Sequence, residues 1–226
     1  MRRLVAVAAL GILGMAVSAE RAAAGGLELR AGAFFPRADS NLFDDDEELY
    51  TVDKGDWVGF TGGVEYTFNL SDHVELGLHV DGYERDHDTV YRDFVRPSGN
   101  EIFQTLKLTI VPAGATVKYV VNPRRGAFTP YFGVGADVVW YEYEEFGEFI
   151  DFDSPDLDVR DDYFIDNDAT FGLHAVAGLR FPLGDDFSLT AEGKYLWAKT
   201  DMGEDFRLNE IDLSGPSATI GFNIRF

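Results

Sequence analysis

The residues of this sequence that could do chemistry are ionisable side chains at alternate positions within apolar stretches. His79, Asp81 and His174 are candidate acid–base groups. A hydrolase would also need a nucleophile beside its base and an oxyanion site, and we find no serine beside a histidine in a deacylase-like pattern. We therefore predict no catalytic site and no cofactor. The full set holds six acids, six bases and two histidines: Glu28, Arg30, Glu65, Glu75, His79, Asp81, Lys107, Lys118, Asp137, His174, Arg180, Glu192, Lys194 and Arg225.

Carboxylates also cluster outside those stretches, most densely at 44–48 and within 142–168. Clustered carboxylate oxygens can hold Ca²⁺ or Mg²⁺, and the weak candidates are Asp151, Asp153, Asp156 and Asp158. Pro155 stands where an EF-hand-type loop needs Asp or Asn, and no glycine follows it. We therefore predict solvated acidic loops without a specific metal site, and diffuse binding of divalent cations is the intermediate case.

Eight segments with an alternating pattern must position the ionisable side chains. They cover 27–35, 58–68, 74–80, 106–121, 132–138, 171–181, 189–197 and 218–226. Apolar residues occupy one face of each segment and polar or small residues the other, which predicts β-strands. In the fourth segment the apolar set changes parity between Ile110 and Ala113, which predicts a bulge or kink at Val111–Pro112. The lengths suit tilted transmembrane strands of ~9–11 residues.

The connections between the segments alternate in length. Short turns lie at 69–73, 122–126 and 182–186, and long loops at 37–56, 84–101, 142–168 and 198–215. This alternation is typical of outer-membrane barrels, with periplasmic turns and extracellular loops. The long loops hold 30 of the 40 acidic residues. We therefore predict an all-β fold, an eight-stranded antiparallel up-and-down transmembrane β-barrel in the cell outer membrane, with acidic extracellular loops and both termini in the periplasm.

Aromatic residues provide a second test of this topology, because aromatic side chains collect at both membrane interfaces. A soluble β-sandwich also alternates, but it does not explain the alternation of loop lengths. The predicted outer girdle is Phe35, Trp57, Phe60, Tyr83, Phe103, Trp140, Phe171 and Trp197. The predicted periplasmic girdle is Phe68, Tyr119, Phe128, Tyr131, Phe181, Phe187 and Phe226.

The amino-terminal segment predicts export from the cytoplasm, and the composition limits the possible partners. A basic start at Arg2 and Arg3, an apolar run to Val17 and small residues near Ala19 or Ala24 predict a signal peptide over 1–24 and a barrel domain over 25–226. An amino-terminal membrane anchor is the alternative, but the run is short for a membrane span. The absence of cysteine excludes disulfides, and a net charge of −21 argues against nucleic acid as a partner.

Several segments carry a resemblance to a known family. They are a strand with an internal proline at 109–119, the Pro-Tyr-x-Gly-x-Gly strand that begins at Pro130, and the ending 221–226. The sequence resembles the small outer-membrane barrels of the OmpW-like family, and more broadly the OmpA/OmpX-like porin family. The resemblance implies an assembly signal at Phe222, Ile224 and Phe226. It also implies contact with outer-membrane lipid, lipopolysaccharide and the barrel-assembly machinery.

The expected function follows from the size of the barrel. Eight strands leave room only for side chains in the lumen, and buried charges must be paired. The balanced ionisable set therefore predicts an ionic plug, and we expect a structural or surface-binding role. The first alternative is the channel for small hydrophobic molecules that the OmpW-like resemblance implies, with a lateral exit near Pro112. The second is an outer-membrane lipid-modifying enzyme.

Overall fold

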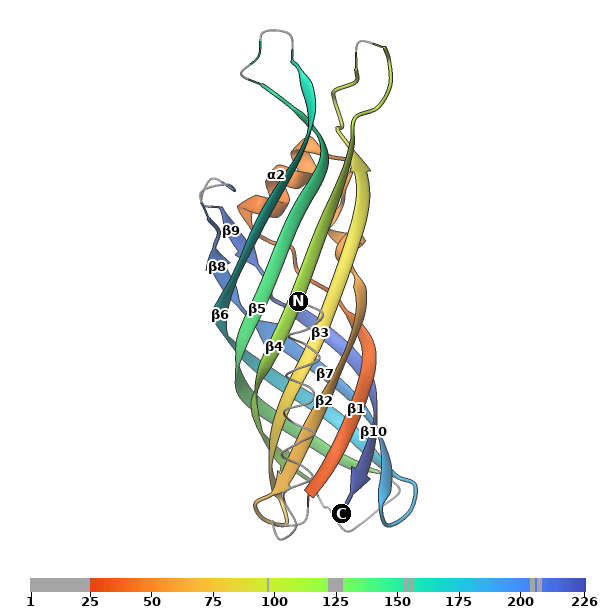
Figure 1. Cartoon of the computed structure of the whole chain (residues 1–226). Coiled ribbons are helices and arrows are strands. Elements are labelled where there is room, and N and C mark those ends of the chain that lie inside the picture. The colour runs from red at the N-terminus through yellow and green to blue at the C-terminus, as the bar shows by residue number, and fades with distance from the viewer. Residues whose placement is uncertain are drawn as a thin grey trace.

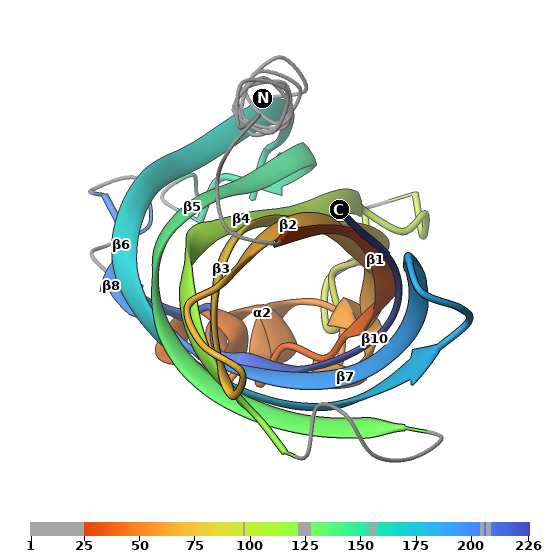
Figure 2. The ribbon, with the colours of Figure 1, turned by 90° about the horizontal axis from the view of Figure 1, so that it is seen from below.

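The computed structural model is a closed barrel of eight antiparallel strands, which confirms the predicted fold class (Figure 1). Each barrel strand pairs with its neighbours in sequence, and the first pairs with the last to close the ring (Figure 2). The structure describes residues 25–96, 98–121, 128–152, 154, 157–203, 206 and 209–226, so the predicted signal peptide at 1–24 and turn at 122–126 lie outside it. The barrel strands are β1 (Gly25–Phe34), β2 (Gly59–Asn69), β3 (Val74–Val90), β4 (Phe103–Val120), β5 (Thr129–Ile150), β6 (Val159–Pro182), β7 (Phe187–Trp197) and β10 (Gly215–Arg225).

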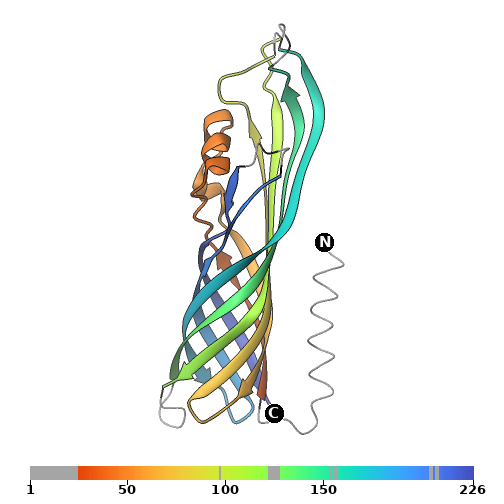
Figure 3. The ribbon, with the colours of Figure 1, turned by 90° about the vertical axis from the view of Figure 1, so that its left-hand side faces the viewer.

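The other elements gather at one end of the barrel, which we call the long-loop end (Figure 3). Helix α2 (Asn41–Leu49) and the 3₁₀ turn η1 (Lys54–Trp57) connect β1 to β2, and the short pair β8 (Lys199–Asp201) and β9 (Glu210–Asp212) connects β7 to β10. At the opposite, short-turn end, Gly25 and Phe226 exchange two backbone hydrogen bonds of 3.1 Å. Among the described residues, no helix is long and apolar enough to cross a membrane.

Strands β3, β5 and β6 are much longer than the sequence pattern predicted. Most of the predicted loop at 142–168 is strand, because β5 continues to Ile150 and β6 begins at Val159, and β3 continues into the predicted loop at 84–101 as far as Val90. These strands rise together above the rest of the ring, with α2 on the opposite side of the mouth (Figure 3). More than half of the acidic residues of these segments therefore lie on strands and not in loops.

The alternation of side chains inverts along each long strand. In the lower part of β5, the outward residues Val134 and Trp140 are 66% and 45% exposed. Beyond Trp140 the outward positions become Glu142 and Glu144, and the inward residue Tyr143 is fully buried. An outward position therefore changes from apolar to acidic where the expected surroundings change from lipid to water. We call the lower part with outward apolar residues the apolar band.

The same inversion explains the change of parity among the apolar residues of β4. The bulge predicted there is wrong. Leu106, Leu108 and Ile110 are buried and point inward, on the same face as Thr116 and Lys118. The register with β3 is unbroken, since Val80 pairs with Ala113 and Tyr83 with Ile110. The apolar residues change parity because the interior becomes apolar, and the strand itself does not shift.

Above the apolar band the interior is filled by an apolar cap. Tyr83 and Trp57, which we expected in the outer girdle, belong to this cap, and the Tyr83 hydroxyl donates a hydrogen bond to the Trp57 carbonyl. Burial of this many large side chains stabilises the long-loop end. The cap includes Phe34, Phe43, Trp57, Tyr83, Ile102, Leu106, Leu108, Ile110, Val139, Tyr141, Tyr143, Leu196, Ile211 and Leu213.

Candidate functional site

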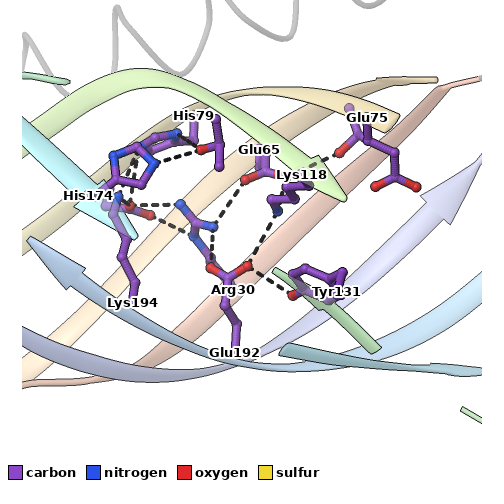
Figure 4. Close-up of polar contacts among 12 residues, drawn as sticks. Arg30, Glu65, Glu75, His79, Lys118, Tyr131, His174, Glu192 and Lys194 are labelled. Atoms are coloured by element: carbon purple, nitrogen blue, oxygen red, sulfur yellow. Dashed lines mark hydrogen bonds and ion pairs between the residues drawn. The ribbon is translucent and has the colours of Figure 1, made fainter. Parts of the chain in front are cut away.

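The interior of the apolar band holds a network of paired charges, here called the luminal network, and Arg30 of β1 lies at its centre (Figure 4). Arg30 donates two hydrogen bonds of 2.8 Å to the two carboxylate oxygens of Asp81. Its Nη1 also donates to Glu65 at 3.3 Å and to Glu192 at 3.1 Å. The side chain is 3% exposed. A buried guanidinium with three carboxylates and fixed two-point geometry holds four strands together.

Lys118 of β4 is the second cation of this group. Its Nζ lies 2.5 Å from Glu65 Oε1 and 3.4 Å from Glu192 Oε2 (Figure 4). Tyr131 donates its hydroxyl to Glu192 Oε2 at 2.9 Å and is 2% exposed. The predicted place of Tyr131 in the periplasmic girdle is therefore wrong. Tyr131 and Asp137 are an even number of residues apart on β5, so their side chains point to the same face of the strand. This spacing in the sequence could have indicated the inward position of Tyr131.

A histidine pair forms the upper part of the luminal network. Asp137 Oδ1 lies 2.9 Å from His79 Nε2, and Oδ2 lies 2.6 Å from His174 Nδ1. Thr116 Oγ1 lies 2.8 Å from His174 Nε2. All three ionisable side chains are fully buried. The carboxylate therefore hydrogen-bonds the His174 ring and lies beside the His79 ring.

The two histidines and Asp137 also offer three potential ligand atoms within 4.8 Å of one another, and this cluster was not among the predicted metal candidates. The three residues lie on β3, β5 and β6, so no spacing in the sequence indicated this cluster. Lys194 Nζ lies 2.9 Å from His79 Nε2 and 3.1 Å from Asp81. This ammonium group occupies the side from which a metal ion would reach His79, so the arrangement favours hydrogen bonding.

The remaining predicted luminal residues lie nearer the short-turn end, with one exception. Arg180 makes a two-point ion pair with Glu75 at 2.8 and 2.9 Å, and partly buried Arg225 lines a small cavity beside them. Glu28 is buried and pairs in register with Glu65. Lys107 is the exception, because it faces outward above the apolar band and pairs with Glu144 at 3.2 Å. Its prediction as a luminal residue is wrong for the same reason as the predicted bulge.

Inward glycines make room for the luminal network. A Cβ atom on Gly135 would lie 2.5 Å from the ring of His174, and one on Gly114 would lie 2.3 Å from Asp137 Oδ1. Neither approach is compatible with a side chain, so these strands carry glycine where a neighbouring charged side chain crosses the lumen.

Among the described residues, one cavity borders the network and another lies at the long-loop end. The first has a volume of about 30 Å³, is lined by Arg30, Asp81, Tyr83 and Pro112, and has room for about one water molecule. The second has a volume of about 240 Å³ and lies at the long-loop end between α2 and the upper parts of β5 and β6. Its lining includes Asp46 and Glu145, which were predicted only as parts of solvated acidic loops.

The weak metal candidates do not form a cluster among the described residues. The carboxylate of Asp151 lies 3.7 Å from Arg160, and that of Asp158 accepts a hydrogen bond from Ser154. Asp153 and Asp156 lie outside the described residues.

Comparison with known proteins identifies the fold family. The family model of the outer membrane protein beta-barrel domain matches residues 5–226. The chain belongs to this family. It is therefore an outer-membrane β-barrel protein, and the predicted resemblance to small outer-membrane barrels is confirmed. Among curated protein sequences, none matches the chain significantly.

Solved structures of other outer-membrane proteins share the fold at low sequence identity. OprG from Pseudomonas aeruginosa is 13% identical, with a TM-score of 0.56, over 91% of this chain and 97% of that one. Neisserial surface protein A is 13% identical, with a TM-score of 0.51, over 90% and 97%. A major outer membrane protein from Thermus thermophilus is 11% identical, with a TM-score of 0.51, over 89% and 99%. At these identities the similarity concerns the fold alone.

Proposed function

We propose that this protein is a closed outer-membrane barrel that binds a ligand at the cell surface and does not form an open channel. The supporting observation is the order of the two interior layers. The luminal network crosses the barrel within the apolar band, and the apolar cap lies above it. A polar solute would have to displace the cap, and a hydrophobic solute would have to pass buried ion pairs.

The orientation of the barrel is part of this proposal. We place the long-loop end outside the cell and both termini in the periplasm, since short turns are periplasmic in barrels of this kind. The outward carboxylates above the apolar band, such as Glu142 and Asp88, then face the medium and the lipopolysaccharide head groups. Divalent cations are the expected counterions there. The barrel-assembly machinery would recognise the end of β10, with Phe222, Ile224 and Phe226.

A narrow channel for small hydrophobic molecules is the second candidate, and one observation favours it. The ladder between β3 and β4 is interrupted where Asp81 and Gly82 face Val111 and Pro112. Pro112 has no N–H group to donate, and it lines the 30 Å³ cavity. A lateral exit would open at this point if the cavity widened.

Permeability separates the two functions. The purified protein is inserted into a planar bilayer and into liposomes, and ion current and the entry of a hydrophobic dye are measured with and without the protein. We expect that the protein carries no ion current and lets no dye enter the liposomes. Dye entry through the wild-type protein, reduced in a Pro112→Ala variant, would instead support the lateral channel and overturn the proposal.

A further inference from the structure

The 240 Å³ cavity at the long-loop end is lined by aromatic and acidic side chains together. Tyr50, Tyr91, Phe149, Phe152, Phe164 and Phe206 supply aromatic surface from separate parts of the chain. Phe149 and Phe164 meet edge to face with ring centroids 4.9 Å apart, as do Tyr50 and Tyr91. At the rim, Leu49 and Phe152 are 37% and 51% exposed, so the cavity is accessible from outside.

Three carboxylates line the same cavity, and their charge is not balanced locally. Asp46 of α2 is 3% exposed and accepts a hydrogen bond of 2.7 Å from the Tyr143 hydroxyl. The same hydroxyl is the hydrogen-bonding neighbour of Glu145, yet it has only one proton to donate. Among the described residues, no lysine or arginine makes an ion pair with Asp46 or Glu145. Asp45 accepts a hydrogen bond of 3.0 Å from Asn209.

A buried, unbalanced negative charge is costly without a cation. Loss of solvation at the partly buried Glu145 raises its pKa to about 7, and burial together with the nearby Glu145 raises the pKa of Asp46 well above its ordinary value. Both groups lie above the apolar band, in the part of the barrel surrounded by water. A cation that enters the cavity would replace the missing counter-charge.

We propose that this cavity binds a small organic cation with an alkylated ammonium group. This inference rests on the proposed surface-binding function and names its ligand class. Aromatic faces attract such a cation through cation–π interactions, and its alkyl groups fill apolar space that a hydrated metal ion would not. The carboxylates of Asp46 and Glu145 supply the charge.

A divalent metal ion fits the lining less well. Ca²⁺ takes six to eight oxygen ligands, whereas most of the lining is carbon. The aromatic rings would have to be replaced by water to complete the coordination shell. The mixture of many aromatic faces with few carboxylates is the arrangement that recognises quaternary ammonium groups.

The test measures binding of choline to the full-length barrel by titration calorimetry at pH 8. The protein is kept in a maltoside detergent, since choline-headed detergents or lipids would compete. The matched ligand control is the neutral analogue of choline in which carbon replaces the nitrogen. We expect choline to bind, and the neutral analogue to bind at least about tenfold more weakly.

Variants then assign the binding to the cavity. Asp46→Asn and Glu145→Gln should each weaken choline binding by about tenfold or more, and Phe164→Leu should weaken it several-fold. Asp161→Asn removes the same charge from the exposed part of β6 and should leave the affinity unchanged. Each variant is first checked for the gel mobility shift on heating that marks a folded barrel. Glu145 is only partly buried, so its variant provides the test if Asp46→Asn does not fold.

Three results would overturn the inference. They are equal binding of choline and its neutral analogue, unchanged affinity in the cavity variants, and binding of Ca²⁺ without binding of choline. In each case a barrel that still blocks ions and dye would leave the proposed surface-binding function standing. A barrel that binds choline but conducts would refute the closed barrel and keep the ligand site.

Discussion

Glu192 is the residue that joins the two cations of the luminal network. It accepts hydrogen bonds from Arg30, Lys118 and Tyr131, and these partners come from β1, β4 and β5. Glu65 contacts the same two cations. Loss of either carboxylate would remove a buried ion-pair partner from both Arg30 and Lys118, and breaking buried pairs costs far more than the loss of a surface pair.

Glu192→Gln keeps the shape of the side chain and removes its charge. We expect it to lower the free energy of unfolding by about 3–5 kcal/mol, the range for breaking a buried ion pair. Asp161→Asn should change it by less than ~1 kcal/mol, because a solvated surface charge is screened. Urea unfolding in detergent micelles, followed by tryptophan fluorescence, measures both. Equal stability of the two variants would show that the luminal network is hydrated and mobile.

Glu145 makes the stability of the long-loop end depend on pH. Its pKa of about 7 in the folded protein lies above its ordinary value of 4.5, so folding favours the protonated form. This contribution to stability is complete below pH 4.5 and is lost as the pH rises through about 7. Asp46 shifts in the same direction, and Asp45, Tyr50, Tyr91 and Tyr143 are the other titratable groups that face the cavity or contact its carboxylates.

We therefore expect the unfolding midpoint of the unliganded protein to fall between pH 5 and pH 8. Glu145→Gln should reduce this fall, whereas Asp161→Asn should retain it. The measurement is the urea midpoint at each pH in a maltoside detergent. A slope in Glu145→Gln that equals the wild-type slope would assign the pH dependence to other groups.

At the scale of the strands, the medium on each side of the barrel wall decides which face of a strand carries apolar residues. Within the apolar band, the sequence pattern correctly predicts the inward positions of Arg30, Asp137 and Glu192. Above the band the interior becomes apolar and the exterior aqueous, so the same period-two pattern inverts. If lipid is assumed to surround the whole segment, Leu108 is predicted to face outward and Lys107 inward, which is the reverse of their positions in the structure. The contacts between side chains on distant strands, such as Asp137 with both histidines, depend on the register of the closed ring, which the sequence pattern does not specify.

Leu108 and Lys107 provide a matched test of this inversion, because they are adjacent on β4. Leu108→Ala should destabilise the barrel by about 2–5 kcal/mol, since it leaves a cavity in the apolar cap. Lys107→Ala should cost less than ~1 kcal/mol, because its pairs with Glu144 and Glu84 are partly exposed. Unfolding in urea measures both. A larger loss for Lys107→Ala would restore the luminal position that the sequence pattern predicted.

At the scale of the whole molecule, the barrel is closed by the pairing of its first and last strands. β1 and β10 pair from Gly26 with Arg225 to Phe34 with Ser217, and Gly25 and Phe226 extend this pairing to the last residue. The ring of Phe226 points outward, is 61% exposed, and lies 6.0 Å from the ring of Tyr66. The backbone of Phe226 thus takes part in closure, while its side chain lies on the exposed surface.

These two contributions of Phe226 can be separated. Phe226→Ala keeps both backbone hydrogen bonds with Gly25, so protein refolded in detergent should retain nearly the wild-type urea midpoint. If the ring is the assembly signal, the same variant should yield much less heat-modifiable barrel in the outer membrane of cells, because a chain that the machinery fails to recognise is degraded before it inserts. Deletion of Phe226 should lower both quantities, since it also removes the two hydrogen bonds. A normal cellular yield of Phe226→Ala would show that closure of the ring, and not recognition of the terminal aromatic residue, is what the end of β10 provides.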